Sequence, residues 1–261
     1  RDLFSNIIIG IMLNNFLPAK AGEVARAYLV RKKEGISVGL TLGTIVLERI
    51  MDLAALTLYI VAILALSPKE NEIFFMSDSA AMRTGTYFML AAAAALFAAI
   101  ALFRFRTEFF MRVMNAAVAP LSAKAAGKFR GILLKFKEGF EVAGDVRLLS
   151  RVFLLSMVVW GLSGINNWFF LKAFGISLPL ASSVFIMAII TMGVVVPPSP
   201  AGVGAIQLIA VILLGFYGIA EKQALAYSVV MNLFAIIYFA IAGFLCLLRE
   251  SVSIRSITKE E

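Results

Sequence analysis

The sequence predicts an all-α polytopic integral membrane protein, organised as an inverted-repeat helical bundle. Three observations support this: an excess of apolar residues, several hydrophobic segments of spanning length, and two similar segments broken by Pro and Gly. The 261 residues are 61% hydrophobic and 15% charged, whereas soluble domains are about 45–50% apolar and about 25% charged. Such a composition is expected where lipid is the solvent.

The first part of the chain predicts two short helices and one long helix. Residues 3–17 form an apolar run that ends at Pro18, and residues 22–30 form a second short helix before a basic stretch. Residues 36–66 form a hydrophobic segment long enough to span, since about 20 apolar residues suffice. We expect a polar loop at residues 67–83.

The central part predicts two spans, at residues 86–103 and 152–170, on either side of a polar region. That region, residues 104–151, holds ten Lys and Arg residues against four Asp and Glu residues. One face of its helical pattern is apolar. Two interpretations stay open: a basic amphipathic helix on an anionic membrane surface, or a helix hairpin packed on its neighbours.

The last part repeats the order of the first. Residues 181–196 form a short apolar run that stops at Pro197-Pro198-Ser199-Pro200, residues 203–217 resume it, and residues 224–248 form the last span. We expect one membrane domain over residues 1–261. Its parts are repeat one (about 3–66), the central spans and amphipathic region (86–172), repeat two (about 180–248) and a tail (249–261).

Basic residues predict the orientation. Arg31-Lys32-Lys33, residues 104–151 and residues 249–259 are basic, whereas the loops at 67–83 and 218–223 are not. Loops rich in Lys and Arg stay in the cytoplasm, and placing these segments there makes the spans alternate. We therefore expect residues 104–151 and the C-terminus on the cytoplasmic side of a prokaryotic cytoplasmic (inner) membrane.

The two broken segments form the candidate inverted repeat. Pro18-Ala19-Lys20-Ala21-Gly22 aligns with Pro198-Ser199-Pro200-Ala201-Gly202 at an offset of 180 residues. In the predicted topology the long spans after them run in opposite directions. Inverted repeats with Pro/Gly-interrupted segments are typical of secondary transporters, and irregular backbone at membrane depth requires protein or water around it. We interpret the segments as re-entrant hairpins; ordinary short spans, and a coincidence of composition, are the alternatives.

Charged residues within the first long span form a candidate site. Glu48, Arg49 and Asp52 have spacings that bring their side chains together on a helix. Glu48 lies about 18 Å along the helix from residue 36, close to the midplane, where a charge costs at least about 2.5–3.5 kcal/mol. Arg26 is the expected partner. A functional cluster is one interpretation, and a structural or interfacial ion pair is the other.

The helix after the first break offers a candidate phosphate site. Glu23 and Arg26 lie near its N-terminus, where free N–H groups and a guanidinium suit a phosphate; an arginine snorkelling to the interface is the alternative. In the second repeat Gly202, Gly204 and Gln207 occupy the comparable turn without charge, so we expect asymmetric charge recognition. Asn166-Asn167-Trp168 are expected to form an interfacial belt rather than a site lining.

Composition also limits the chemistry. Histidine is absent and Cys246 is the single cysteine, so the commonest metal ligand, the usual proton shuttle and an intrachain disulfide are missing. The net charge of +8 is interpreted as an orientation signal, since no nucleic-acid-binding motif accompanies it. We expect no catalytic residue, no metal, no cofactor and no nucleic-acid partner.

Three motifs in this order resemble one known family. Residues 15–26 (NFLPAKAGEVAR), Glu48-Arg49-x-x-Asp52 and residues 198–204 (PSPAGVG) resemble the lysylphosphatidylglycerol synthase transmembrane-region family, also described as a flippase-like domain. The resemblance covers residues 9–248. The family includes the N-terminal flippase domain of the multiple peptide resistance factor, which translocates aminoacylated phosphatidylglycerol. It also includes stand-alone members, some linked to hopanoid or glycolipid pathways.

The resemblance implies a lipid flippase or transporter rather than an enzyme. Its substrate is expected to be an anionic, aminoacylated or polyprenyl/glycolipid-type amphiphile, so the partners are anionic phospholipid or lipid-phosphate headgroups. A membrane-embedded transferase acting on a lipid phosphate, or a non-catalytic partner of a lipid-synthesising enzyme, is the alternative. A homo-oligomer is left open.

Two departures from the family pattern modify this expectation. No aminoacyl-transferase domain follows Leu248, so synthase activity is expected to be absent, and Met231-Asn232 stand where many relatives carry an Arg. Because the chain starts at Arg1 without Met, helices upstream of it are left open. The expected lining of the substrate cavity is Asn15, Pro18, Gly22, Glu23, Arg26, Glu48, Arg49, Asp52, Pro198, Pro200, Gly202, Gly204, Gln207 and Asn232.

The topology is testable with single cysteines at Ser77 and Ser122 in a Cys246→Ser background. We expect membrane-impermeant thiol reagents to label the two positions from opposite sides, with Ser122 cytoplasmic, because the basic region around it is retained inside. Labelling of both from the same side would contradict the orientation and the inverted repeat.

Overall fold

The computed structural model describes residues 2–17, 21–75, 145–194 and 200–250, and every secondary-structure element within these ranges is helical. Three of these helices are long and apolar enough to cross a membrane: α3 (Val38–Leu66), α8 (Val146–Ala173) and α11 (Glu221–Glu250). The prediction of a helical membrane protein is confirmed. The expected span at 86–103 and most of the polar region, up to residue 144, lie outside the described residues.

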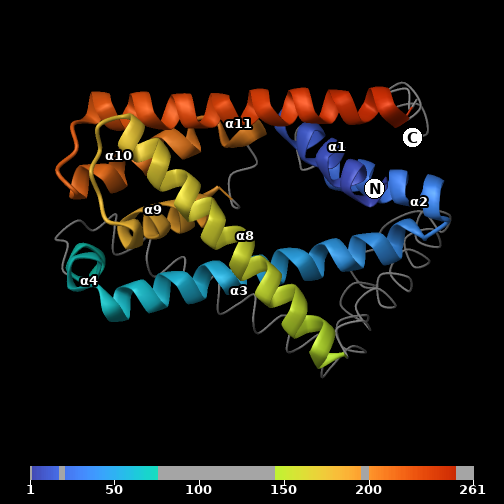
Figure 1. Ribbon diagram of the computed structural model, residues 1–261, viewed down its shortest axis with the longest axis horizontal. Coiled ribbons are helices and arrows are strands. Elements are labelled where there is room, and N and C mark those ends of the chain that lie inside the picture. The colour runs from blue at the N-terminus through green and yellow to red at the C-terminus, as the bar shows by residue number, and fades with distance from the viewer. Residues whose placement is uncertain (1, 18–20, 76–144, 195–199, 251–261) are drawn as a thin grey trace, which may run out of the picture.

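Four shorter helices form two hairpins. Hairpin one consists of α1 (Asp2–Phe16) and α2 (Ala21–Glu34). Hairpin two consists of α9 (Leu180–Gly193) and α10 (Ala205–Phe216), with the short η3 (Pro200–Gly202) between them. In Figure 1, α3 and α11 run in opposite directions along two edges of the molecule, and the hairpins lie between them, entering from opposite ends.

Each hairpin packs against both α3 and α11. The first arm of each hairpin packs on the long helix from the other end of the chain, and the second arm packs on the long helix that follows it. In hairpin one, α1 contacts α11 and α2 contacts α3; in hairpin two, α9 contacts α3 and α10 contacts α11. In addition, η3 contacts α1, so the break in hairpin two lies against the first arm of hairpin one. Each hairpin is therefore buried in part by helices from the other end of the chain.

The helix α8 crosses the molecule between the two edges and packs on α3 and α9 (Figure 1). Its outer face carries large apolar side chains that are exposed, among them Leu154, Leu155, Val158 and Leu162. The outer face of α11 is similar. Exposed apolar faces of this extent mark interaction surfaces in a soluble protein; on helices of spanning length they face acyl chains.

The element boundaries differ from expectation in two places. The expected polar loop begins with a helix, α4 (Pro68–Phe75), because Pro68 suits a first helical position and Asn71 Nδ2 donates to Leu64 O at 3.0 Å. The helix α8 begins at Val146, six residues before the expected span, because Asp145 Oδ1 accepts two N–H groups of the first turn.

The arms of hairpin one approach so closely that Gly22 is required. A Cβ at Gly22 would lie 2.1 Å from Gly10 O and 2.6 Å from Asn14 Oδ1, whereas a Cβ at Gly215 would meet nothing within 4 Å. We expect Gly22→Ala to lose about 1–3 kcal/mol of stability through overpacking. Gly215→Ala, the control, should be neutral or stabilising by up to about 1 kcal/mol.

Thermal unfolding of both purified variants in detergent measures this difference. A melting temperature for Gly22→Ala equal to that of the wild type would contradict the close packing of α1 on α2.

Candidate functional site

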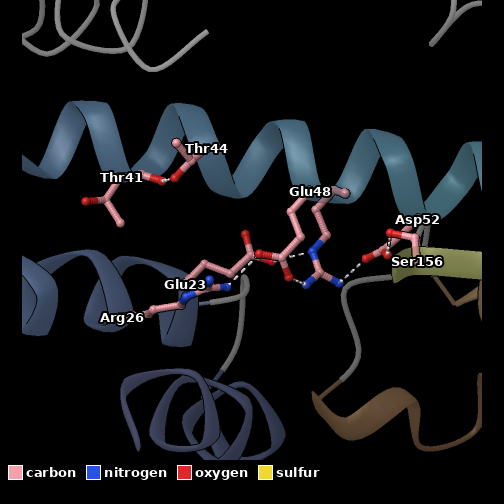
Figure 2. Close-up of polar contacts among 8 residues, drawn as sticks. Glu23, Arg26, Thr41, Thr44, Glu48, Asp52 and Ser156 are labelled. Atoms are coloured by element: carbon pink, nitrogen blue, oxygen red, sulfur yellow. Dashed lines mark hydrogen bonds and ion pairs between the residues drawn. The ribbon is translucent and has the colours of Figure 1, made fainter. Parts of the chain in front are cut away.

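Five charged side chains from α2 and α3 form one cluster, the ion network. It consists of Glu23, Arg26, Glu48, Arg49 and Asp52. Residues three or four apart share a helix face, and the packing of α2 on α3 brings the two faces together. Figure 2 shows the side chains of both helices pointing toward one another.

The distances join all five groups through two guanidiniums. Arg26 Nη1 lies 3.0 Å from Glu48 Oε2, so the pairing expected of Arg26 is confirmed. Arg49 Nη2 lies 2.8 Å from Glu48 Oε1. Arg49 also approaches Asp52 Oδ2 at 3.4 Å and Glu23 Oε1 at 3.9 Å. Glu48 is thus shared between the two arginines.

The ion network is partly buried, and its charges do not balance. The exposed fraction of the side chain is 15% for Asp52 and 19% for Arg26, but 46% for Arg49. The cluster is therefore neither fully buried nor fully exposed. With all groups ionised, three carboxylates face two guanidiniums, which leaves one net negative charge.

The ion network extends to α8 through Asp52. Its Oδ1 accepts hydrogen bonds from Ser156 Oγ at 2.8 Å and from Trp160 Nε1 at 3.1 Å. Sequence analysis did not identify Ser156 or Trp160. Their i, i+4 spacing puts them on one face of α8. The sequence of an apolar span does not show which residue a hydroxyl or an indole within it will bind.

The break in hairpin two is an irregular turn at η3. Ala201, Gly202 and Gly204 have φ values of 52°, 67° and 88°. The left-handed region is costly for Ala201 and easily adopted by glycine. Gln207 Oε1 accepts the Gly204 N–H at 2.7 Å, which satisfies one free donor at the start of α10. Pro200 begins η3, while Pro18 and Pro198 lie outside the described residues.

Three other expected site residues, all uncharged, lie away from these contacts. Gly22 is buried at the crossing of α1 and α2, and Asn15 lies partly exposed in the last turn of α1. Asn232 is 5% exposed in α11. No described contact joins Asn232 to the ion network. Within the described ranges, no group of three or more Asp, Glu or Cys side chains is arranged so that it could hold a metal ion.

The expectation of an interfacial belt at residues 166–168 is wrong for Asn167, which is 3% exposed. Its Nδ2 donates to Ser183 Oγ at 2.9 Å and to Ser183 O at 3.1 Å, and its Oδ1 accepts from the Tyr227 hydroxyl. Asn167 faces α9 because the α8 turn that carries it packs there. Its polar group is therefore satisfied inside the protein rather than at a headgroup.

A crevice of about 340 Å³ lies beside Asn167 and the break in hairpin two. Side chains of α8, α9, α10 and α11 line it, and most of them are apolar: Asn167, Met187, Ile190, Thr191, Val194, Ile206 and Met231. Trp160, which contacts the ion network, and Asn167 are seven residues apart on one face of α8, or about 10 Å. A polar cluster and an apolar crevice thus lie along the same helix face, an arrangement that suits an amphiphile.

Comparison with known proteins gives a consistent result. The family model described as the lysylphosphatidylglycerol synthase TM region matches residues 1–243. A UPF0104 membrane protein of Methanocaldococcus jannaschii is 28% identical over 253 residues, which cover 96% of this chain and 97% of that protein. One from Pyrococcus horikoshii is 22% identical, covering 88% and 70%. No solved structure matches.

The link from α3 to α8 can be tested at Asp52. We expect Asp52→Ala to lose about 1–3 kcal/mol, since the Ser156 hydroxyl and the Trp160 N–H would lose their acceptor. Asp52→Asn keeps an oxygen at this position and should lose less than about 1 kcal/mol, because its ion partner Arg49 is 46% exposed and exposed ion pairs contribute little.

Denaturant unfolding measures both losses, and the fluorescence of Trp160 in a Trp168→Phe background reports the local change. Equal losses in the two variants would show that the charge of Asp52, and not its hydrogen bonds, holds the helices.

Proposed function

Because the chain belongs to the lysylphosphatidylglycerol synthase transmembrane-region family, we propose that it moves a membrane lipid between the leaflets of the bilayer, as a flippase or transporter. The substrate is an anionic, aminoacylated or polyprenyl/glycolipid-type amphiphile. The UPF0104 relatives are named only as membrane proteins, so their names add the location and no substrate.

The observation that carries the proposal is the exchanged packing of the two hairpins. Each hairpin lies between the long helices, its first arm on the long helix of the other unit, and η3 touches α1. This pattern supports an inverted repeat of two re-entrant hairpins whose breaks face each other. In transporters built this way, the substrate site lies near the midplane and access alternates around it.

The ion network supplies a place for the headgroup. Arg26 uses one contact to Glu48, and a guanidinium has five N–H donors. It is therefore able to bind a phosphate oxygen while keeping its ion pair. The start of α2 adds free N–H groups and the positive end of a helix dipole. The apolar crevice, farther along α8, suits the part of the lipid next to its tails.

The distribution of basic residues supports the orientation. Arg31, Lys32 and Lys33 lie in the last turn of α2, and Arg249 in the last turn of α11. Figure 1 shows these two helix ends at the same end of the molecule. We assign this end to the cytoplasmic side of a prokaryotic cytoplasmic membrane, following the positive-inside rule.

The test is transbilayer movement of headgroup-labelled anionic lipid in reconstituted vesicles. We expect the wild-type protein to accelerate movement without changing the lipid. Arg26→Gln should slow it by about tenfold or more, since a hydrogen bond to a charged group contributes about 1.5–3 kcal/mol. Arg31→Gln, an exposed arginine on the same helix, is the matched control and should move lipid within about twofold of wild type.

The same vesicles separate the alternatives. A covalently altered lipid would indicate a transferase. Unaltered lipid that does not move faster, together with stimulation of an added lipid synthase, would indicate a non-catalytic partner and contradict transport.

A further inference from the structure

Glu70 is a buried carboxyl that the proposed lipid path does not use. It lies in α4, which starts two residues after α3 ends. Its residue exposure is 3%, and among the described residues it is the only acidic or basic side chain that is buried. An ionised carboxylate without a cation partner is costly to bury, so its surroundings need an explanation.

Two hydroxyl groups from hairpin two meet at one oxygen of Glu70. Ser182 Oγ and the Tyr217 hydroxyl both donate to Oε1, the latter at 3.2 Å. Ser182 lies in the first turn of α9, and Tyr217 follows the last residue of α10. A single carboxyl oxygen therefore fastens both outer ends of hairpin two to the α3–α4 segment.

The two hairpins are fastened to this segment by different chemistry. The polar contact of hairpin one with this segment is the Arg26–Glu48 pair, in which the guanidinium keeps its charge at any ordinary pH. The polar contacts of hairpin two with Glu70 come from hydroxyls alone, and no described Lys or Arg lies within 4 Å of Glu70. The strength of the second attachment thus depends on whether one carboxyl is ionised.

The charged and titratable groups around Glu70 are few. On α4 itself, Lys69 Nζ lies 5.2 Å from the centroid of the Tyr217 ring and Glu72 is exposed. The last turn of α3, all of α9 and all of α10 carry no ionisable side chain. Burial, and then the neighbouring Glu70 carboxylate, raise the pKa of Tyr217 far above its ordinary value, so its hydroxyl stays a donor.

We propose that Glu70 is a proton-binding site that fastens hairpin two when ionised and releases it when protonated. A hydrogen bond to an ionised acceptor is roughly twice as strong as a neutral one. When a proton from water binds to Oε2, an O–H bond forms, the negative charge is lost, and both hydroxyl bonds at Oε1 weaken. The attachment is therefore strong when the carboxyl is ionised and weak when it has taken up a proton.

For lipid movement, the proton site rests on the proposed transport: a proton would release hairpin two while hairpin one stays attached. The attachment itself can be measured without any lipid substrate. A reporter cysteine at Leu213, which is 2% exposed in α10, reacts with a polar thiol reagent only when hairpin two opens. All variants carry Leu213→Cys and Cys246→Ser.

The reporter protein carries only Leu213→Cys and Cys246→Ser. The reaction rate of each further variant is divided by the rate of the reporter protein at the same pH, and this ratio cancels the pH dependence of the thiol. Glu70→Gln mimics the protonated acid, so at pH 8 it should react about tenfold faster. At pH 4.5 the ratio should fall toward one, because uptake of a proton by the wild-type carboxyl removes the difference between the two proteins. Glu72→Gln, an exposed carboxyl on the same helix, should give a ratio of one at both values of pH.

Ser182→Ala and Tyr217→Phe each remove one hydroxyl and keep the test valid if Glu70→Gln folds poorly. Each should accelerate the reaction at pH 8 and have little effect at pH 4.5. Ratios for these variants that stay equal at both values of pH would overturn the proton site and leave only a structural attachment. A positive result with no lipid movement in vesicles would instead overturn the proposed function alone.

Discussion

Hydrocarbon offers no hydrogen bonds, so every charged group and every break in a helix at membrane depth must find its partner inside the protein. The polar contacts of this chain follow from that constraint. Arg26 meets Glu48, Asp52 meets Ser156 and Trp160, and Asn167 meets Ser183 and Tyr227. Each contact joins two different helices, so the groups that lipid cannot satisfy also hold the hairpins and spans in place.

The exchange of hairpin arms makes the two ends of the chain depend on each other. Because α1 packs on α11 and α9 packs on α3, a displacement of either hairpin disturbs a long helix that belongs to the other unit. The charges are nevertheless distributed unequally. The ion network lies on α2 and α3, whereas the comparable turn of hairpin two is held by Gln207 and by glycines. Similar architecture with unequal chemistry suits a carrier that binds a headgroup at one hairpin and moves the other.

Sequence reasoning predicted the order of the apolar helices in the described part of the chain and the pairing of Arg26, because both follow from local periodicity and from the cost of charge in lipid. It missed contacts made across long separations. Ser156 and Trp160 lie more than 100 residues from Asp52, and the two hydroxyls that meet Glu70 are 112 and 147 residues away. Glu70 resembled a loop residue because α4 is short and polar.

The proposed transport requires that the two breaks face one hydrated cavity inside the membrane. The most direct measurement is the reaction of cysteines at Ala21 and at Ala201 with a small polar thiol reagent in native membranes, with and without added lipid substrate. If the breaks share a wet cavity, both cysteines react although both lie at membrane depth, and the same lipid protects both. If neither reacts with the polar reagent while a lipid-soluble reagent labels both, the breaks face hydrocarbon and the shared cavity does not exist.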